Sequence, residues 1–443
     1  MKQEMISFLT ENFNDIKNIC EYLYKNPEES YKEEKSSSYI CEVLKKYNFN
    51  IQNNYLDIPN SFYASKGSGY PKICFLCEYD AIKGKGHITG HNALAAISIG
   101  ASISVGEIIE QTNGTIIIIG CPGEYLGGTK LTLVKQGVFD DIDVVMECHP
   151  YNTTAESGTS SAIIPLNIKF IGNSGLSFLS KDEYTSLDCI LLTFNILNFL
   201  LKGFPKDVEV NYILSKGGYT PLLTPLESEA KFYIRAKEFE MAELAENKLR
   251  EIVRYVSNLT HIPNKVSLYE SYNEELVTNR TLSRIFTNNL KENGIINIGS
   301  PIDVYAGLSI GAVSKKVPTI HPYIAIKDDE NIKYGSTDFA DCTISEYAFE
   351  QIHKASASLA CTALDLIERE DLLQEIKQEF YNKKYRKTLS CSIFLNRFFI
   401  FCYSSYKIFT WFKIKYTYFI LLLIDTINFI MSKQFTSILP CAF

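Results

Sequence analysis

Histidine and carboxylate side chains, which can hold a metal ion or transfer protons, cluster at three places in this sequence, each just after an apolar run. The set comprises Asp80, His87, His91, Glu124 and His149. Ligand sites in open α/β sheets gather where the ends of neighbouring parallel strands meet at one edge. Residue type and placement leave two interpretations open: a metal or catalytic site, or polar caps at the ends of strands.

Three nearly continuous apolar runs precede these residues, at 72–77, 115–121 and 143–148. Runs that are apolar on both faces are typical of parallel strands buried beneath helices. Helical spacing of apolar residues in 4–47 and 92–111 supplies such helices. The pattern therefore predicts a series of βαβ units covered by helices on both faces.

The character of the chain changes near residue 161, where alternating polar and apolar residues indicate half-buried strands. Strand, helix, strand, strand and helix follow one another, which predicts a separate small antiparallel-sheet domain. The buried-strand pattern then resumes. We predict an α/β fold whose parts are a parallel-sheet domain formed by 1–160 and 276–375, an inserted α+β domain at 161–275, and a tail at 376–443.

Charge is unevenly distributed along the chain. Residues 381–443 hold nine basic residues and one acidic residue, a net charge of +8, so residues 1–380 carry −15 of the total of −7. An acidic body argues against nucleic acid as the main partner. The longest apolar stretch of the tail is shorter than a transmembrane helix and contains Asp425. We expect a poorly structured tail, with contact between 381–443 and an anionic membrane as the weaker alternative.

Cysteine usage points to a reducing compartment. The twelve cysteines are scattered without the spacing of a disulfide framework. The N-terminal residues lack the apolar segment of a signal peptide, so we expect a cytoplasmic protein. Cys74 and Cys77 form a C-x-x-C, but they lie in a strand pattern and no second pair exists, which favours core packing over redox or zinc chemistry.

Several motifs occur in an order typical of one family. They are Asn26-Pro27-Glu28-Glu29, Glu78-Tyr79-Asp80-Ala81, Gly86-His87, Gly90-His91-Asn92, Pro122-Gly123-Glu124-Tyr125, Gly127-Gly128-Thr129-Lys130, Cys148-His149-Pro150 and Ile320-His321-Pro322. Over residues 5–370 the chain resembles the aminoacylase and p-aminobenzoyl-glutamate hydrolase group of zinc- or manganese-dependent metallopeptidases. The resemblance implies a zinc-peptidase-like catalytic domain, a ferredoxin-like lid that also forms the dimer, and hydrolysis of N-acyl amino acids or dipeptides.

The family's two-metal site is only partly present in this sequence. The resemblance implies that His91 and His149 hold the first metal ion and that Glu124 is the general base. The other ligand positions hold different residues: Thr89 for the bridging Cys, Tyr125 for the Glu of the second metal ion, and Ser336 for its distal His. Neutral hydroxyl groups do not offset the charge of two divalent ions and are poor ligands for zinc.

Positions outside the ligand set are also altered. The family's lid His, lid Asn and C-terminal Asp are here Leu176, Leu222 and Ser309. The resemblance implies that Arg235 binds substrate and that Asp80 supports the ligands. We expect His87 to have a structural role at its turn and His321 to support the fold.

These observations favour a protein that kept the fold and lost the two-metal chemistry. We expect at most one zinc or manganese ion and an inactive or strongly impaired hydrolase. The alternative is a mononuclear amidohydrolase or dipeptidase that uses His91, His149 and Glu124 as ligands, at the cost of its general base, because no other carboxylate is evident in the sequence. A third interpretation is a membrane-associated binding protein that uses the basic tail. The expected ligand is a small amino-acid conjugate or dipeptide, and the expected assembly is a homodimer through the lid.

Overall fold

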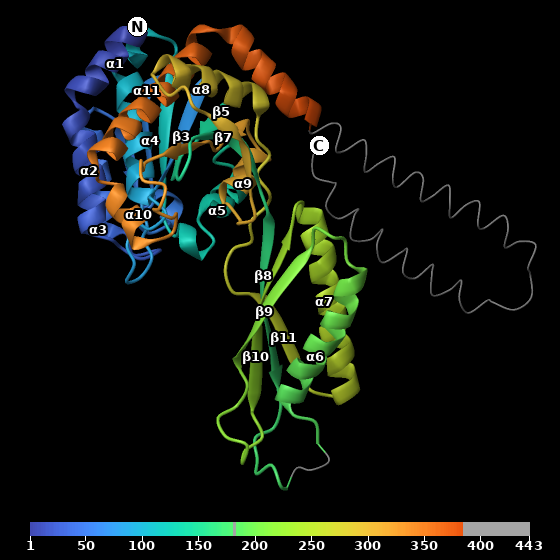
Figure 1. The fold of residues 1–443 in the computed structure, drawn as a ribbon. Coiled ribbons are helices and arrows are strands. Elements are labelled where there is room, and N and C mark those ends of the chain that lie inside the picture. Colours follow the sequence, from blue (N-terminus) through green and yellow to red (C-terminus); the bar gives the residue numbers. More distant parts are fainter. Residues whose placement is uncertain (180–182, 384–443) are drawn as a thin grey trace, which may run out of the picture. The chain divides into compact units, whose positions relative to one another are not determined.

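The computed structural model describes residues 1–179 and 183–383 (Figure 1), so the prediction of a poorly structured tail lies largely outside the described residues. Residues 1–380 form one compact unit. A helix at 370–383 runs through the predicted domain boundary at 375. Ile376 in this helix is buried, and its carbonyl accepts a hydrogen bond from Asn279 Nδ2 at 3.0 Å. The segment 376–380 therefore belongs to the body of the protein and not to the tail.

The first domain is built around a six-stranded sheet with the order β1-β2-β4-β3-β5-β13. Its strands are β1 (Asn50–Asn53), β2 (Phe62–Ser68), β3 (Lys72–Glu78), β4 (Gly114–Cys121), β5 (Val144–Met146) and β13 (Thr319–Ile320). Strands β4, β3, β5 and β13 run parallel, and β2 and β1 add an antiparallel edge. The three predicted parallel strands are confirmed.

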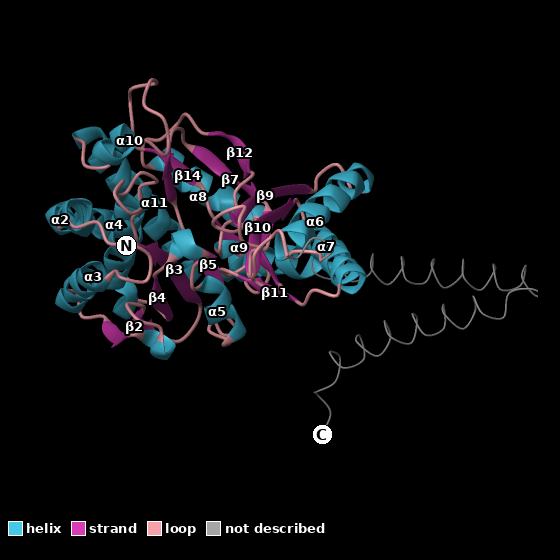
Figure 2. Cartoon of the chain, turned by 90° about the horizontal axis from the view of Figure 1, so that it is seen from below, coloured by secondary structure: helices cyan, strands magenta, loops and turns pink. Residues whose placement is uncertain are grey.

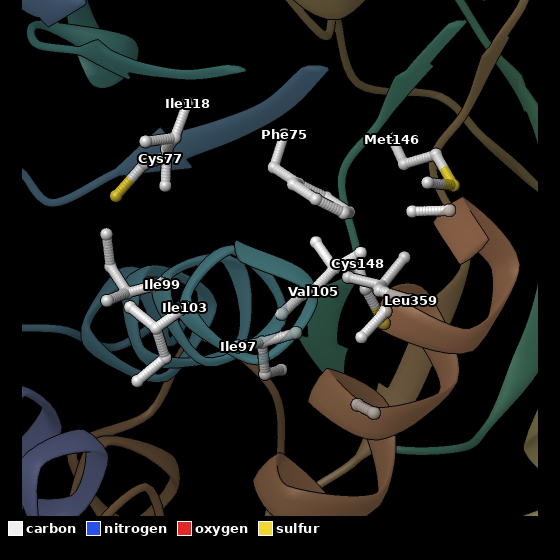
Figure 3. Packing of buried hydrophobic residues seen from close by; sticks show 14 of the residues in the cluster. Phe75, Cys77, Ile97, Ile99, Ile103, Val105, Ile118, Met146, Cys148 and Leu359 are labelled. Carbon is white, nitrogen blue, oxygen red and sulfur yellow. The ribbon is translucent and has the colours of Figure 1, made fainter. Parts of the chain in front are cut away.

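Helices cover both faces of this sheet. Besides the helix at 370–383, the first domain contains the helices α1 (Lys2–Glu11), α2 (Phe13–Lys25), α3 (Glu34–Lys46), α4 (His91–Ile108), α5 (Lys130–Lys135), α8 (Arg280–Glu292), α9 (Ile310–Ser314), α10 (Thr337–Cys342) and α11 (Glu346–Glu368). Helix α4 is buried along nearly its whole length, which explains why it is apolar all round. Figure 3 shows α4 and α11 packed beneath Phe75, Cys77 and Ile118 of the sheet. On the opposite face, α5 and α9 pack against a second apolar cluster.

The C-x-x-C pair lies in β3, as the strand pattern predicted. Side chains of a strand alternate between the two faces of a sheet, so residues three apart point to opposite sides. Cys77 belongs to the cluster on the α4 face, whereas Cys74 belongs to the cluster on the α5 face. The two thiols therefore cannot hold one metal ion together, and both are free and buried.

A second, four-stranded sheet of the first domain was not predicted. It has the order β12-β7-β14-β6 and consists of β6 (His149–Tyr151), β7 (Ala155–Ser160), β12 (Gly299–Val304) and β14 (Tyr323–Ala325). Strand β14 pairs in parallel with β6, which places Tyr323 opposite His149. This small sheet fixes the backbone on which His149 lies.

The inserted domain has the predicted α+β architecture (Figure 2). Its elements are β8 (Ala162–Ile171), α6 (Ser186–Leu200), β9 (Glu209–Lys216), β10 (Glu227–Ala236), α7 (Phe239–Thr260) and β11 (Asn264–Leu268). The strands form an antiparallel sheet with the order β11-β8-β10-β9, the ferredoxin-like arrangement. Both helices pack on the sheet through one apolar cluster.

Short 3-10 turns occur in both domains, at η1 (Tyr55–Asp57), η2 (Ile109–Gln111) and η3 (Glu124–Leu126) of the first and η4 (Leu201–Gly203) of the inserted one.

Candidate metal centre

Three buried side chains converge at the carboxyl edge of the parallel sheet. Glu78 is the last residue of β3, His91 is the first residue of α4, and His149 is the first residue of β6. One ligand atom from each lies within 4.8 Å of those of the other two. The structure thus brings together the two histidines predicted from sequence and adds a carboxylate that was not predicted.

His91 is held in a fixed orientation by two carboxylates. Its Nδ1 lies 2.7 Å from Asp80 Oδ1, and its Nε2 lies 3.2 Å from Glu78 Oε2. Burial alone would lower the pKa of His91, but Glu78 and Asp80 outweigh it and raise the pKa to about 9. A carboxylate behind the distal nitrogen of a histidine is the usual support for a metal ligand, because it fixes the tautomer. The predicted supporting role of Asp80 matches this geometry.

His149 is oriented by its own strand. Its Nδ1–H donates to the carbonyl of Pro150 at 2.8 Å, which leaves Nε2 as the nitrogen with a lone pair. Burial, together with the nearby His321 and His91, lowers the pKa of His149 to about 3. His149 is therefore neutral near pH 7, the state that a metal ligand requires. His321 lies beside it, with ring centroids 5.3 Å apart, and its Nε2 lies 3.3 Å from Glu147 Oε1.

Lys130 is a buried cation that the sequence did not single out. Its ammonium contacts Glu78, lies 3.1 Å from Glu124 Oε2 and 3.4 Å from Glu147 Oε2, and donates to Ser309 Oγ at 3.1 Å. The lysine side chain is completely buried. The structure therefore assembles three carboxylates around one ammonium beside the histidine pair.

Glu124, the predicted general base, is adjacent to the triad but is not part of it. Ser309 and Lys130 hold its Oε2, whereas its Oε1 is buried and has no hydrogen-bond partner among the described residues. Burial raises the pKa of this carboxyl, although Lys130 opposes the shift. Gly128 has a φ of +69°, and a Cβ there would lie 2.6 Å from Glu124 Oε1. A glycine is thus required to leave room for the carboxylate.

The replaced ligand positions have formed contacts of their own. The hydroxyl of Thr89 hydrogen-bonds that of Tyr125. The Tyr125 ring stacks on the His91 imidazole, with ring centroids 4.6 Å apart. Ser336 caps α10, because its Oγ accepts the backbone N–H of Phe339 at 3.1 Å. These groups are used in packing and capping, and none of them offers an anionic ligand to a second ion.

The remaining predicted residues lie apart from the triad. His87 Nε2 bonds the carbonyl of Leu23 at 3.1 Å, in line with its expected structural role. Arg235 lies in β10 of the lid and donates to Asn211. Leu176 and Leu222 are exposed lid residues.

The structure places more carboxylates at the centre than sequence reasoning named. Asp80 and Glu124 were named, and Glu78 and Glu147 lie there as well; Glu78, Asp80 and Glu147 are buried, and only 7% of the Glu124 side chain is accessible. Sequence reasoning offered Glu124 as the carboxylate ligand beside His91 and His149, whereas the structure gathers Glu78 with the two histidines. Sequence could have indicated Glu78 and Glu147, because each is a charged residue at the end of an apolar strand. The donor set fits one divalent ion: two imidazoles and a carboxylate are ligands of catalytic zinc.

Comparison of sequences identifies homologues of this chain. The chain is 28% identical over 328 residues to the Xaa-Arg dipeptidase of Mus musculus, a match that covers 72% of this chain and 75% of the relative. It is 26% identical over 455 residues to one of the subunits of p-aminobenzoyl-glutamate hydrolase from Escherichia coli, covering 85% and 94%. No protein-family model matches the chain.

Comparison of structures identifies proteins of the same fold. An aminobenzoyl-glutamate utilization protein from Klebsiella pneumoniae superposes with a TM-score of 0.63 at 13% identity, covering 81% of this chain and 97% of the other. A dinuclear metal-binding peptidase of the M20 family from Bacillus subtilis superposes with a TM-score of 0.57 at 13% identity, covering 80% and 99%. The protein thus has the fold of the M20 peptidases and amidohydrolases. Its homologues include Xaa-Arg dipeptidase and p-aminobenzoyl-glutamate hydrolase.

A further buried carboxyl near the centre provides a pH prediction. Glu33 Oε1 accepts the backbone N–H groups of Gly123 at 2.7 Å and Tyr31 at 2.9 Å, and burial raises its pKa from 4.5 to about 7. The protonated Glu33 carboxyl stabilises the fold. This contribution is complete at pH values below 4.5, the pKa of the group in the unfolded chain, and it is lost as the pH rises through the folded-state pKa of about 7. By linkage the loss amounts to on the order of 3 kcal/mol. We expect Glu33→Gln to melt at a higher temperature than wild type at pH 8 but not at pH 5.

Thermal melts of both proteins between pH 5 and pH 8 test this expectation. Glu34→Gln, which changes an exposed neighbour, is the matched control and should show no pH-dependent difference. A Glu33→Gln difference that stays constant with pH would show that Glu33 is ionised in the folded state throughout this range.

Proposed function

We propose that this protein is an M20-type amide hydrolase whose metal centre is reduced to one divalent ion, bound by Glu78, His91 and His149, and whose activity is strongly impaired. The proposal rests on two changes at the centre: the loss of two expected metal ligands and the presence of an additional carboxylate. Thr89 and Tyr125 bond each other where the resemblance implies metal ligands, while Glu78 joins the two histidines. The substrate class, N-acyl amino acids or dipeptides, is supported by the activities in the homologues' names.

The electrostatics support one divalent ion. Four buried carboxylates surround a single ammonium and an imidazole, so the centre is net negative and favours a further positive charge. A bound divalent ion would lower the pKa of a water molecule and polarise an amide carbonyl. A second ion lacks the anionic bridging ligand that would offset its charge.

Glu78 as third ligand removes the objection to a mononuclear site, because Glu124 is then free to accept a proton. The buried, unpartnered Oε1 of Glu124 suits that role, and Lys130 and Ser309 hold the other oxygen in place. The missing second ion accounts for the proposed impairment, because its share of the charge stabilisation in the transition state is lost.

Metal content and hydrolysis of purified protein test the proposal. We expect about one zinc or manganese ion per chain and slow cleavage of a panel of Arg-terminated dipeptides, N-acetyl amino acids and p-aminobenzoyl-glutamate, well below the usual kcat range of about 1–1000 per second. His149→Ala should lose the ion and the activity. Glu124→Gln should lose the activity and keep the ion.

His353→Ala serves as the matched control, since His353 packs on Phe13 away from the centre and should change neither readout. Two tightly held ions per wild-type chain, or a kcat within the usual range, would contradict the reduced centre. Binding of the ion that survives His149→Ala would place it elsewhere in the protein.

The predicted homodimer through the lid is also a proposal. It is supported by apolar residues that the lid exposes, among them Phe199 at 74% and Ile213 at 61% of their full accessible area.

A further inference from the structure

Lys130 has an unusual position for a lysine. It is the first residue of α5, at the end of a helix where a positive charge is disfavoured by the helix dipole. Its side chain is nevertheless completely buried. A buried ammonium is stable only where anionic groups surround it, and here Glu78, Glu124 and Glu147 do so.

The same three carboxylates would make a cation site if the lysine were absent. Among the described residues, neither oxygen of Glu147 nor the Oε1 of Glu124 accepts a well-formed hydrogen bond. The groups beside Glu147 are the Lys130 ammonium, 3.4 Å from Oε2, and the His321 imidazole, 3.3 Å from Oε1, and the ammonium supplies the positive charge. Oxygen ligands of this kind suit manganese and magnesium. Glu78 also faces both groups, because Oε1 contacts Lys130 and Oε2 lies 3.2 Å from His91 Nε2.

We propose that the Lys130 ammonium is a built-in cation that occupies the carboxylate site of Glu78, Glu124 and Glu147 and excludes a divalent ion from it. The lysine keeps this carboxylate site free of a divalent ion, and its ammonium, 3.1 Å from Glu124 Oε2, holds that carboxylate in place. The inference shares Glu78 with the proposed one-ion triad, but it concerns a separate set of ligands on the other side of that carboxylate.

Replacement of Lys130 by Met tests this inference, because Met keeps the length of the side chain and removes the charge. We expect Lys130→Met to bind one Mn²⁺ ion per chain more than wild type, measured by calorimetric titration and by elemental analysis after dialysis. Lys130→Arg, which keeps a positive charge, should not gain an ion. Lys135→Met changes an exposed lysine of the same helix and should behave as wild type.

A thermal-shift measurement keeps the test decisive if Lys130→Met folds poorly. The variant leaves three carboxylates without a counter-ion, so millimolar Mn²⁺ should raise its melting temperature more than that of wild type. The double variant Lys130→Met with Glu147→Gln, which carries less uncompensated charge, should fold more readily and still take up the ion. Equal numbers of ions in a folded Lys130→Met and in wild type, with equal thermal shifts, would overturn the proposal.

Different experimental results would contradict the one-ion function and the Lys130 proposal. Wild type without any metal would contradict the one-ion function, whereas the Lys130 proposal depends only on the difference between the variant and wild type.

Discussion

Combined replacement of Thr89 by Cys, Tyr125 by Glu and Ser336 by His is expected to raise the metal content from one ion to two per chain. The first two changes add a thiolate and a carboxylate, which supply the negative charge that a second divalent ion needs. The third adds an imidazole nitrogen. Lys130 does not prevent this, because it is bound to other carboxylates, Glu78 and Glu124 among them.

The restored centre should also hydrolyse dipeptides faster. A second ion that stabilises the transition state contributes several kcal/mol, and each 1.36 kcal/mol is a factor of ten, so we expect a gain in kcat/KM on the order of 100-fold. The changes have a cost. Loss of the Ser336 cap on α10 removes about 1 kcal/mol of stability, and loss of Tyr125 removes the stacking on His91. Elemental analysis and kinetics on the same preparation measure both effects.

The matched control is the triple variant Thr89→Ala, Tyr125→Phe and Ser336→Ala. It removes the hydroxyl bond and the cap without adding ligands, so it should remain at one ion with unchanged slow hydrolysis. If the restored variant is folded and still holds a single ion, the scaffold has lost the geometry of the second site as well as its ligands.

The fold could be predicted from sequence because its signals are local. The apolar runs of β3, β4 and β5 are buried on both faces, and the alternation along β10 matches its alternating burial. The second sheet was missed because its strands are short and pair across long separations, as when β14 pairs with β6. Periodicity carries no information on such pairings.

Part of the site could also be predicted, because some of its residues stand in local sequence motifs. His91 and His149 stand in recognisable motifs at strand ends, whereas Glu78 and Glu147 are charged residues at the ends of apolar runs. Parallel pairing of β3 with β5 brings these two carboxylates to one edge. Lys130 follows a glycine turn, with Gly127 and Gly128 both at positive φ, that returns the chain to the centre. No single segment contains a signal for a contact between Lys130 and Glu78.

The contact between Thr89 and Tyr125 is the most informative result of the fold for function. Sequence predicted two independent losses of ligands, but the two residues share a hydrogen bond. Coupled changes of this kind fill the space of a ligand pair with a packed, neutral contact. They support the proposal that the centre holds one ion.

Asp80→Asn is expected to weaken metal binding by about 10- to 100-fold, the usual effect of removing the carboxylate behind a histidine ligand. Asp80 is buried, with Oδ1 on His91 Nδ1 at 2.7 Å and Oδ2 accepting from Ser30 Oγ at 2.7 Å and the Tyr125 N–H at 3.0 Å. The amide cannot fix the His91 tautomer or increase its basicity as the carboxylate does. Ser30→Ala is the matched control, because it removes a bond to the other oxygen and leaves His91 untouched.

Zn²⁺ titrations of wild type, Asp80→Asn and Ser30→Ala at pH 7 and pH 9 separate two effects of Asp80. Asp80 also helps to raise the pKa of His91 to about 9, so in wild type a proton competes with the metal ion at pH 7. That competition is weaker in Asp80→Asn, which partly hides the loss of affinity at pH 7. At pH 9 the competition is reduced in wild type too, so the deficit of Asp80→Asn should be larger there. A deficit that is absent at both pH values, or equally large in Ser30→Ala, would show that Asp80 does not orient His91 for a metal ion.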